Sequence, residues 1–182
     1  KQVDIKLGAT TLATIKASEI GEDKKWSCVI EADSLASDIA TNVIISAVDN
    51  AGHVKTAPVF NVYKDTKKPD LVLKNIDNGT VITEQDLKYG KFTIKGSWND
   101  NGGSGLSGGL SKLEYKLNSG TWTTISTPNS EWSQEITLTE GKGQTISFKA
   151  TDAVGNEQTL DLKEILIDLS LPTITTSVPE EL

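Results

Sequence analysis

The sequence contains one motif twice at a fixed separation, and this feature constrains the fold most. The stretch "SAVDNAGHVKT" (Ser46–Thr56) matches "KATDAVGNEQT" (Lys149–Thr159), with Ala, Asp and Gly at the same places 103 residues apart. Pro69 and Pro172 keep the same separation, and no gap is needed between the motif and the prolines. A separation held over so long a stretch indicates two copies of one structural unit.

Two further matches lie upstream at slightly different separations. The stretch "VDIKLGATTLATI" (Val3–Ile15) matches "LEYKLNSGTWTTI" (Leu113–Ile125) 110 residues later, and Trp26 matches Trp132, 106 residues later. The separation changes only across expected loops, which tolerate insertions. No residues of the first copy match Leu71–Gly109, so we expect the first copy to lack the leading strands of the unit.

The repeat sets the expected domain boundaries. We expect an N-terminally incomplete domain over residues 1–68, a complete domain over residues 69–171, and the start of a third repeat or a linker over residues 172–182. The chain contains no Met and begins with Lys, so we interpret it as a segment of a longer protein.

Alternation of apolar and polar residues predicts seven strands in the second copy. They are Leu71–Lys74, Lys91–Trp98, Lys112–Leu117, Trp122–Ser126, Ser133–Leu138, Thr145–Thr151 and Thr159–Ile167. The stretch Ile82–Gly90, where Asp86 follows Thr83 by three residues, predicts at most a helical turn or a loop. About seven short strands in ~100 residues fit an immunoglobulin-like β-sandwich, with another small Greek-key sandwich or barrel as the alternative.

Composition excludes several classes of function. The chain carries 25 acidic and 18 basic residues, a net charge of −7, which argues against binding to nucleic acid. No apolar run approaches the length that spans a bilayer, so we expect no membrane insertion within this segment. A single Cys (Cys28) excludes an internal disulfide, and one Cys with one His (His53) makes a His/Cys metal site implausible.

A family resemblance rests on the order of several motifs in the second copy. The stretch "GSGLSGGLSKLEYKLNSGTWTTI", followed by G-x-x-x-I-x-F-x-A-T-D-A-V-G-N and "IDLSLP", resembles the bacterial immunoglobulin-like repeats of surface and secreted proteins. The resemblance covers nearly the whole chain. Two departures are His53, where Asn is expected after Gly52, and the missing leading strands of the first copy.

The resemblance implies tandem immunoglobulin-like β-sandwiches outside the cell, at the bacterial surface, beside neighbouring repeats of the same chain. Such modules are non-catalytic structural spacers or adhesive stalks, so no enzyme activity and no catalytic residue are expected. The alternative is a module that binds a glycan or a host protein, including one that serves as an accessory to an enzyme. No cofactor is expected apart from calcium, considered next.

Three oxygen-bearing residues form the candidate metal site. Asp100 follows the second predicted strand, and Asp152 and Asn156 follow the sixth, at loops that share one end of an immunoglobulin-like sandwich. Hard oxygen ligands of this kind suit Ca²⁺. The competing interpretation is structural, because Asp and Asn bond their own backbone in turns and Gly155 supplies a positive φ.

Two tryptophans form the candidate ligand site. Trp122 and Trp132 would bind a sugar if their ring faces were exposed, whereas on strands they would fill the core. Trp26 repeats Trp132, which favours packing. We expect "WSCVI" to be a strand in which Cys28 faces the same side as Trp26 and Ile30, as a buried and inert thiol.

Overall fold

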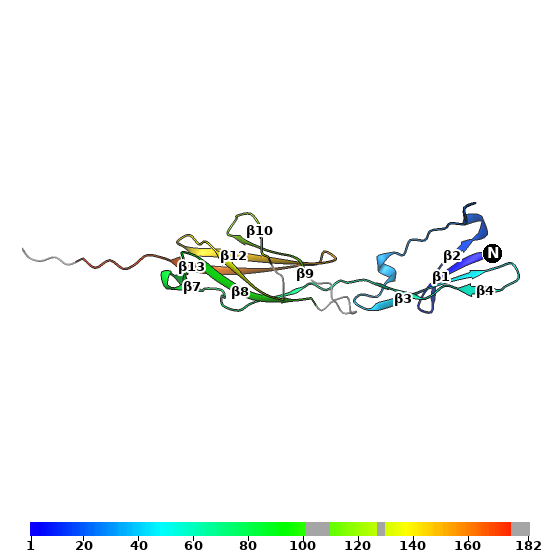
Figure 1. Cartoon of the computed structure of the whole chain (residues 1–182), viewed down its shortest axis with the longest axis horizontal. Coiled ribbons are helices and arrows are strands. Elements are labelled where there is room, and N and C mark those ends of the chain that lie inside the picture. Colours follow the sequence, from blue (N-terminus) through cyan, green and yellow to red (C-terminus); the bar gives the residue numbers. More distant parts are fainter. Residues whose placement is uncertain (101–109, 127–129, 176–182) are drawn as a thin grey trace, which may run out of the picture. The chain divides into compact units, whose positions relative to one another are not determined.

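The computed structural model describes residues 1–100, 110–126 and 130–175 of the chain. The chain forms two compact units, which we call unit 1, Lys1–Lys67, and unit 2, which begins at Lys68 (Figure 1). The described residues contain strands and three single 3₁₀ turns but no α-helix, which confirms the predicted all-β class. No helix in these residues has the length and apolar character needed to cross a membrane.

Unit 2 is a sandwich of two sheets whose strands pair antiparallel, except for the edge strand β7, which pairs in parallel with β13. Its strands are β6 (Asp70–Leu73), β7 (Val81–Thr83), β8 (Phe92–Asn99), β9 (Leu110–Leu117), β10 (Thr123–Thr124), β11 (Glu131–Ile136), β12 (Gly141–Asp152) and β13 (Glu157–Asp168). One sheet has the order β11-β8-β6 and the other has the order β10-β9-β12-β13-β7. This division of strands between two sheets is that of an immunoglobulin-like sandwich, as predicted.

The core of unit 2 lies between these two sheets. Alternation points Phe92 and Ile94 of β8 inward, where they meet Ile146, Phe148 and Ala150 of β12. All five side chains are buried, as their period-two pattern predicts. Burial of an Ile or Phe side chain stabilises a domain by about 1.5–3 kcal/mol, so this interior supplies the main driving force for folding unit 2.

All seven predicted strands of unit 2 are present, and one further strand was missed. β7 is only three residues long and pairs in parallel with the end of β13, Ile82 opposite Ile167. Its sequence carries no alternation long enough to detect, because a distant partner and not a local pattern holds it extended. The predicted helical turn is confirmed directly after it, with Thr83 donating to Asp86 Oδ2 from its main-chain N–H and its hydroxyl, both at 2.8 Å.

Unit 1 contains a single sheet. Its elements are β1 (Gln2–Leu7), β2 (Thr10–Lys16), the 3₁₀ turns η1 (Ala17–Glu19) and η2 (Ala32–Ser34), β3 (Ala40–Val48), β4 (Val54–Thr56) and β5 (Phe60–Tyr63). The strand order is β2-β1-β3-β4, with β5 also paired to β3. This order reproduces β10-β9-β12-β13 of unit 2. Residues 1–67, all of which the structure describes, contain no counterpart of β6 or β8, so unit 1 is one sheet of the sandwich.

The prediction that "WSCVI" forms a strand is wrong. Trp26–Ile30 lies in the long irregular segment between β2 and β3, which runs back along the sheet (Figure 1). Trp132, which matches Trp26 in the repeat, lies on β11, and every residue of β11 is paired with a residue of β8. Unit 1 has no strand equivalent to β8, so Trp26–Ile30 has no strand in that unit with which to pair. Cys28 is half-buried, which also corrects the expectation of a buried thiol.

The predicted facing of that segment is nonetheless confirmed. Trp26, Cys28 and Ile30 all pack against the apolar cluster of the sheet, which contains Val3 and Val43 among its buried members. The alternation therefore predicts the facing of these side chains correctly, although the segment is not paired with a strand.

Gly96 provides a test of the closed core of unit 2. A Cβ at this position would lie 2.3 Å from the Trp132 ring and 2.8 Å from the Val72 carbonyl oxygen. We expect Gly96→Ala to lower the free energy of unfolding of unit 2 by about 1–3 kcal/mol, the usual cost of overpacking. Chemical denaturation measures it, and Ser97→Ala, on the opposite face of β8, is the control, with an expected change below about 0.5 kcal/mol. Equal effects of the two substitutions would contradict the packing described here.

Candidate functional site

The turn between β12 and β13 is built around one buried carboxylate. Asp152 Oδ1 accepts hydrogen bonds from the main-chain N–H groups of Val154, Gly155 and Asn156 at 2.9, 2.7 and 2.8 Å. Asp152 Oδ2 accepts a fourth from the Asn156 side-chain amide at 2.8 Å. Gly155 takes a φ of 100°, which favours glycine. The sequence D-A-V-G-N is thus a turn whose Asp satisfies three main-chain donors.

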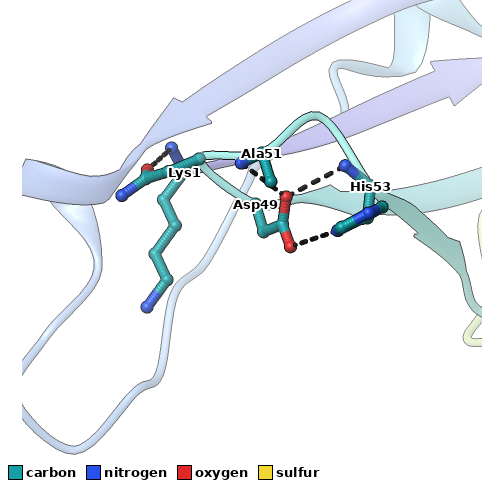
Figure 2. Close-up of polar contacts among 5 residues, drawn as sticks. Lys1, Asp49, Ala51 and His53 are labelled. Atoms are coloured by element: carbon teal, nitrogen blue, oxygen red, sulfur yellow. Dashed lines mark hydrogen bonds and ion pairs between the residues drawn. The ribbon is translucent and has the colours of Figure 1, made fainter.

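The turn between β3 and β4 repeats this arrangement with two changes. His53 stands in place of Asn, and the Gly52 N–H donates to the Asp49 main-chain carbonyl oxygen at 3.2 Å instead of to the carboxylate. Asp49 Oδ1 accepts from the N–H groups of Ala51 and His53 at 2.8 and 2.9 Å, and Asp49 Oδ2 lies 3.0 Å from His53 Nδ1 (Figure 2). Gly52 again has a positive φ, 86°. His53 therefore does with its ring nitrogen what Asn156 does with its amide, so this departure from the family pattern preserves the turn.

The two turns differ in their surroundings. Asp152 is 1% exposed, whereas the Asp49 side chain is 47% exposed. Burial by itself would raise the pKa of Asp152, but the bonds from Asn156 and the turn N–H groups outweigh it and hold that pKa below its ordinary value. The pKa of Asp49 is also lowered, chiefly by the hydrogen bond from His53. Both carboxylates are therefore ionised at neutral pH, and neither is a general acid.

The structure brings a second carboxylate to the buried turn. A carboxylate oxygen of Asp100, the residue after β8, lies within 4.8 Å of one from Asp152, and Asp100 is also buried. Asn156, the third predicted ligand, bonds directly to Asp152. Two neighbouring buried carboxylates favour a cation between them, since like charges repel strongly where water is excluded.

Calcium binding at Asp100, Asp152 and Asn156 stays a prediction. We expect millimolar CaCl₂ to raise the melting temperature of unit 2, because a ligand bound only to the folded state stabilises it by about 2.7 kcal/mol at 100 times its Kd. Asp100→Asn, which removes the charge and keeps the size, should abolish the rise. An unchanged melting temperature together with no heat in a calorimetric titration would exclude the site.

The buried turn also yields a matched pair of substitutions. Asp152→Ala leaves buried N–H donors without an acceptor and should cost unit 2 about 1–3 kcal/mol of unfolding free energy. Asp49→Ala removes the same carboxylate where water reaches the donors, so a loss below about 1 kcal/mol is expected for unit 1. Denaturation curves with and without each substitution give both values, and a larger loss for Asp49→Ala would refute this account of the turns.

Of the two tryptophans considered for a sugar platform, Trp132 lies in the core. It is 6% exposed, its ring lies 5.8 Å from that of Phe148, and Gly96 leaves room for it on β8. The Trp132 ring therefore has no exposed face for a ligand. Of the two tryptophans predicted to bind a sugar, Trp122 alone is left as a candidate.

Trp122 lies half-buried on the outer face of the larger sheet, among charged side chains. The ammonium nitrogens of Lys116 and Lys149 lie 4.8 and 5.1 Å from the centre of its ring, within cation–π range. Lys149 also pairs with the nearly buried Glu114 at 3.4 Å. A hydrogen bond from Lys112, at 2.7 Å, is the main cause that lowers the pKa of Glu114. Trp122 thus packs among lysine side chains, one of which is paired with Glu114.

Sequence reasoning missed one feature, an apolar cleft in unit 1. The cleft has a volume of about 600 Å³ and lies between the ends of β1 and β3 and the segment after β2. Val3, Ala47 and Trp26 line it, together with the charged or polar side chains of Asp49, His53 and Lys55. Its signal lies in the repeat, because unit 1 has the apolar face of a sandwich while residues 1–67 form no strand of a second sheet.

Comparison with known proteins gives distant likenesses in structure. No protein-family model matches the chain. No curated protein shows significant similarity to it. The fibronectin(III)-like modules of Clostridium thermocellum CbhA match with 17% identity over 97% of this chain and 83% of theirs, with a TM-score of 0.45.

A Ca²⁺-stabilized adhesin with which an Antarctic bacterium binds ice matches with 17% identity over 92% of this chain, with a TM-score of 0.44. This chain spans 40% of the length of that structure. Both scores are low. The assignment of an immunoglobulin-like sandwich therefore rests on the strand order and register of unit 2 and not on these likenesses.

Proposed function

We propose that this chain is a non-catalytic spacer or adhesive stalk segment of a bacterial protein that acts outside the cell. The observation that carries the proposal is the path of the chain through unit 2. It enters at β6, where Asp70 pairs with Asn99 at the end of β8. It leaves from β13, whose last residue, Asp168, pairs with Thr83.

These two points lie at opposite poles of unit 2. The end of β8 lies beside the end of β12, since the Asp100 and Asp152 carboxylates are within 4.8 Å of each other. β13 starts from that same pole, after the Asp152 turn, and runs for 12 residues to the other pole, which is about 40 Å at ~3.3 Å per residue. A module entered at one pole and left at the other adds its full length to the chain, which suits a spacer.

The strand directions also suit a segment that bears tension. β6 and β13 both run from the entry pole to the exit pole, and β7 pairs with β13 in parallel. Tension between the ends therefore runs along the strands and loads their hydrogen bonds together instead of one at a time. The buried Ile82 holds β7 in this position.

The alternative function, binding of a glycan or a host protein, has weaker support. Its predicted platform is reduced to Trp122, and two lysine ammonium groups already contact that ring. The spacer function is therefore preferred.

Single-molecule stretching of the whole chain tests the spacer function. We expect one discrete unfolding event for unit 2, with a gain in length of about 300 Å, because 99 residues from Asp70 to Asp168 extend by up to ~3.6 Å each and replace a folded length of about 40 Å. Ile82→Ala should lower the unfolding force, because it removes the buried anchor of β7. Val81→Ala, whose side chain is exposed, should leave the force unchanged. Smooth extension without a discrete event would contradict the proposal.

A further inference from the structure

One tight turn of unit 2 places an aromatic side chain almost wholly in solvent. The turn Lys88–Lys91, with the sequence K-Y-G-K, connects the 3₁₀ turn η3 (Glu84–Asp86) to β8. Lys88 and Lys91 bond to each other through both main-chain N–H and C=O pairs, at 2.9 and 3.1 Å. Tyr89, at the tip, is 92% exposed. A single exposed aromatic is ordinary by itself, but the backbone that carries this one is not.

The backbone at Tyr89 has a conformation that does not suit tyrosine. Its φ is 53° and that of Gly90 is 71°, so both central residues of the turn are left-handed, as in a type I′ hairpin. The first of these positions favours Asn, Asp or Gly, because the Cβ of other residues crowds the main chain there. Tyrosine at the tip therefore costs stability, and strain of this kind is retained where the side chain has a use.

The core holds the turn rigidly on both sides. Leu87, directly before the turn, packs against the core cluster of unit 2, and Phe92, directly after it, is a buried member of that cluster. These two side chains fix the base of the turn. The Tyr89 ring is therefore presented from a rigid base, and a ring with two side-chain torsions loses little conformational entropy when a ligand binds to it.

Positive charge lies beside the exposed ring. The Lys88 ammonium nitrogen is 5.6 Å from the centre of the Tyr89 ring, and no carboxylate among the described residues pairs with it. Lys91 lies 3.7 Å from Glu135 in an exposed pair, which is weak in water. The carboxylate of Asp86 is already bonded by the preceding turn. The tip thus offers a flat apolar ring beside two ammonium groups, on a chain whose net charge is −7.

We propose that the Lys88–Lys91 turn is a binding site for a sugar ring that carries a carboxylate or a sulfate, as a unit of an acidic polysaccharide. The axial C–H groups of a pyranose form a flat apolar face that stacks on the Tyr89 ring. The negative group accepts charge-assisted hydrogen bonds from the ammonium groups of Lys88 and Lys91. A protein partner fits less well, because a stable protein interface buries about 800 Å² on each side.

This site is separate from the tryptophan platform predicted from the sequence. It lies at the pole of unit 2 where β8 begins, opposite the pole where Asn99 ends β8 and pairs with Asp70. It provides an adhesive surface on the segment and does not rest on the spacer function. The stretching experiment reports on β7 and β13, whereas the binding experiment reports on Tyr89, so either can fail without the other.

A nuclear magnetic resonance titration of the whole ¹⁵N-labelled chain tests the proposal. We expect trigalacturonate to shift the amide signals of Tyr89 and Gly90 in a saturable way, with a Kd on the order of 1 mM, because one ring and two exposed charges hold the ligand. Binding should weaken in about 0.5 M NaCl, which screens these charges. A sulfated trisaccharide identifies the preferred anion, since binding of either charged sugar supports the proposal and the ratio of the two Kd values separates the sources. Neutral maltotriose should give no shift.

Substitutions separate binding from folding. Tyr89→Asn should raise the melting temperature of unit 2 by about 4–8 °C, because Asn tolerates a positive φ, and should weaken binding by at least about tenfold. Tyr89→Phe keeps the ring and should keep the Kd within about twofold, whereas Lys88→Gln should weaken binding about threefold or more. Val154→Ser, which changes an exposed apolar residue in the turn between β12 and β13, is the matched control and should alter neither the melting temperature nor the binding.

Several results would overturn the proposal. The absence of any shift with both charged sugars would do so, and so would equal binding of maltotriose, since charge would then play no part. Equal affinity of Tyr89→Asn and the unmodified chain would show that the ring makes no contact with the sugar. Shifts at Tyr89 and Gly90 caused by vesicles of phosphatidylcholine and phosphatidylserine, but not by the sugars, would assign the turn to a membrane surface instead.

Discussion

The packing of β8 and β11 against β9 and β12 is the interaction on which the rest of this chain depends. A β-sheet with one apolar face is stable in water only if that face is covered. Unit 2 covers the face with a second sheet from its own residues, and its inner side chains are almost completely removed from solvent. Unit 1 has the same sheet without these strands, and its apolar face stays partly open. The contrast between the two units follows from this one interaction.

Local and non-local features respond differently to the loss of the second sheet. The Asp–Gly turn forms in both units around the equivalent carboxylate, because all of its bonds lie within five residues. The strand at Trp132 forms only where β8 pairs with it, and its counterpart at Trp26 is irregular. His53 is an example of a local feature. Its ring nitrogen replaces the Asn side-chain amide, and the hydrogen bond to the Asp carboxylate is kept.

The difference between local and non-local features also explains which elements can be predicted from the sequence. Strands with long alternation, such as β8 and β12, were predicted from their own residues, and so was the turn at Asp152. β7 was missed because a distant strand holds it extended, and Trp26–Ile30 was wrongly predicted as a strand because alternation cannot show that a partner is missing. Among the candidate site residues, the sequence placed Asp100 and Asp152 at one end of the sandwich, where the structure brings them together. It could not distinguish the buried Trp132 from the half-buried Trp122, since exposure depends on packing across the sheets.

Native-state hydrogen exchange on the unmodified chain tests the central claim most directly, by comparing equivalent amides of β12 and β3. If the second sheet determines stability, the amides of β12 around Phe148 will exchange only through global unfolding of unit 2. Those of β3 around Ile45 will then exchange at least about 100-fold faster, through opening of a weakly covered sheet. Equal protection at these repeat-related positions would contradict the claim, because it would show that unit 1 is as stable without the second sheet as unit 2 is with it.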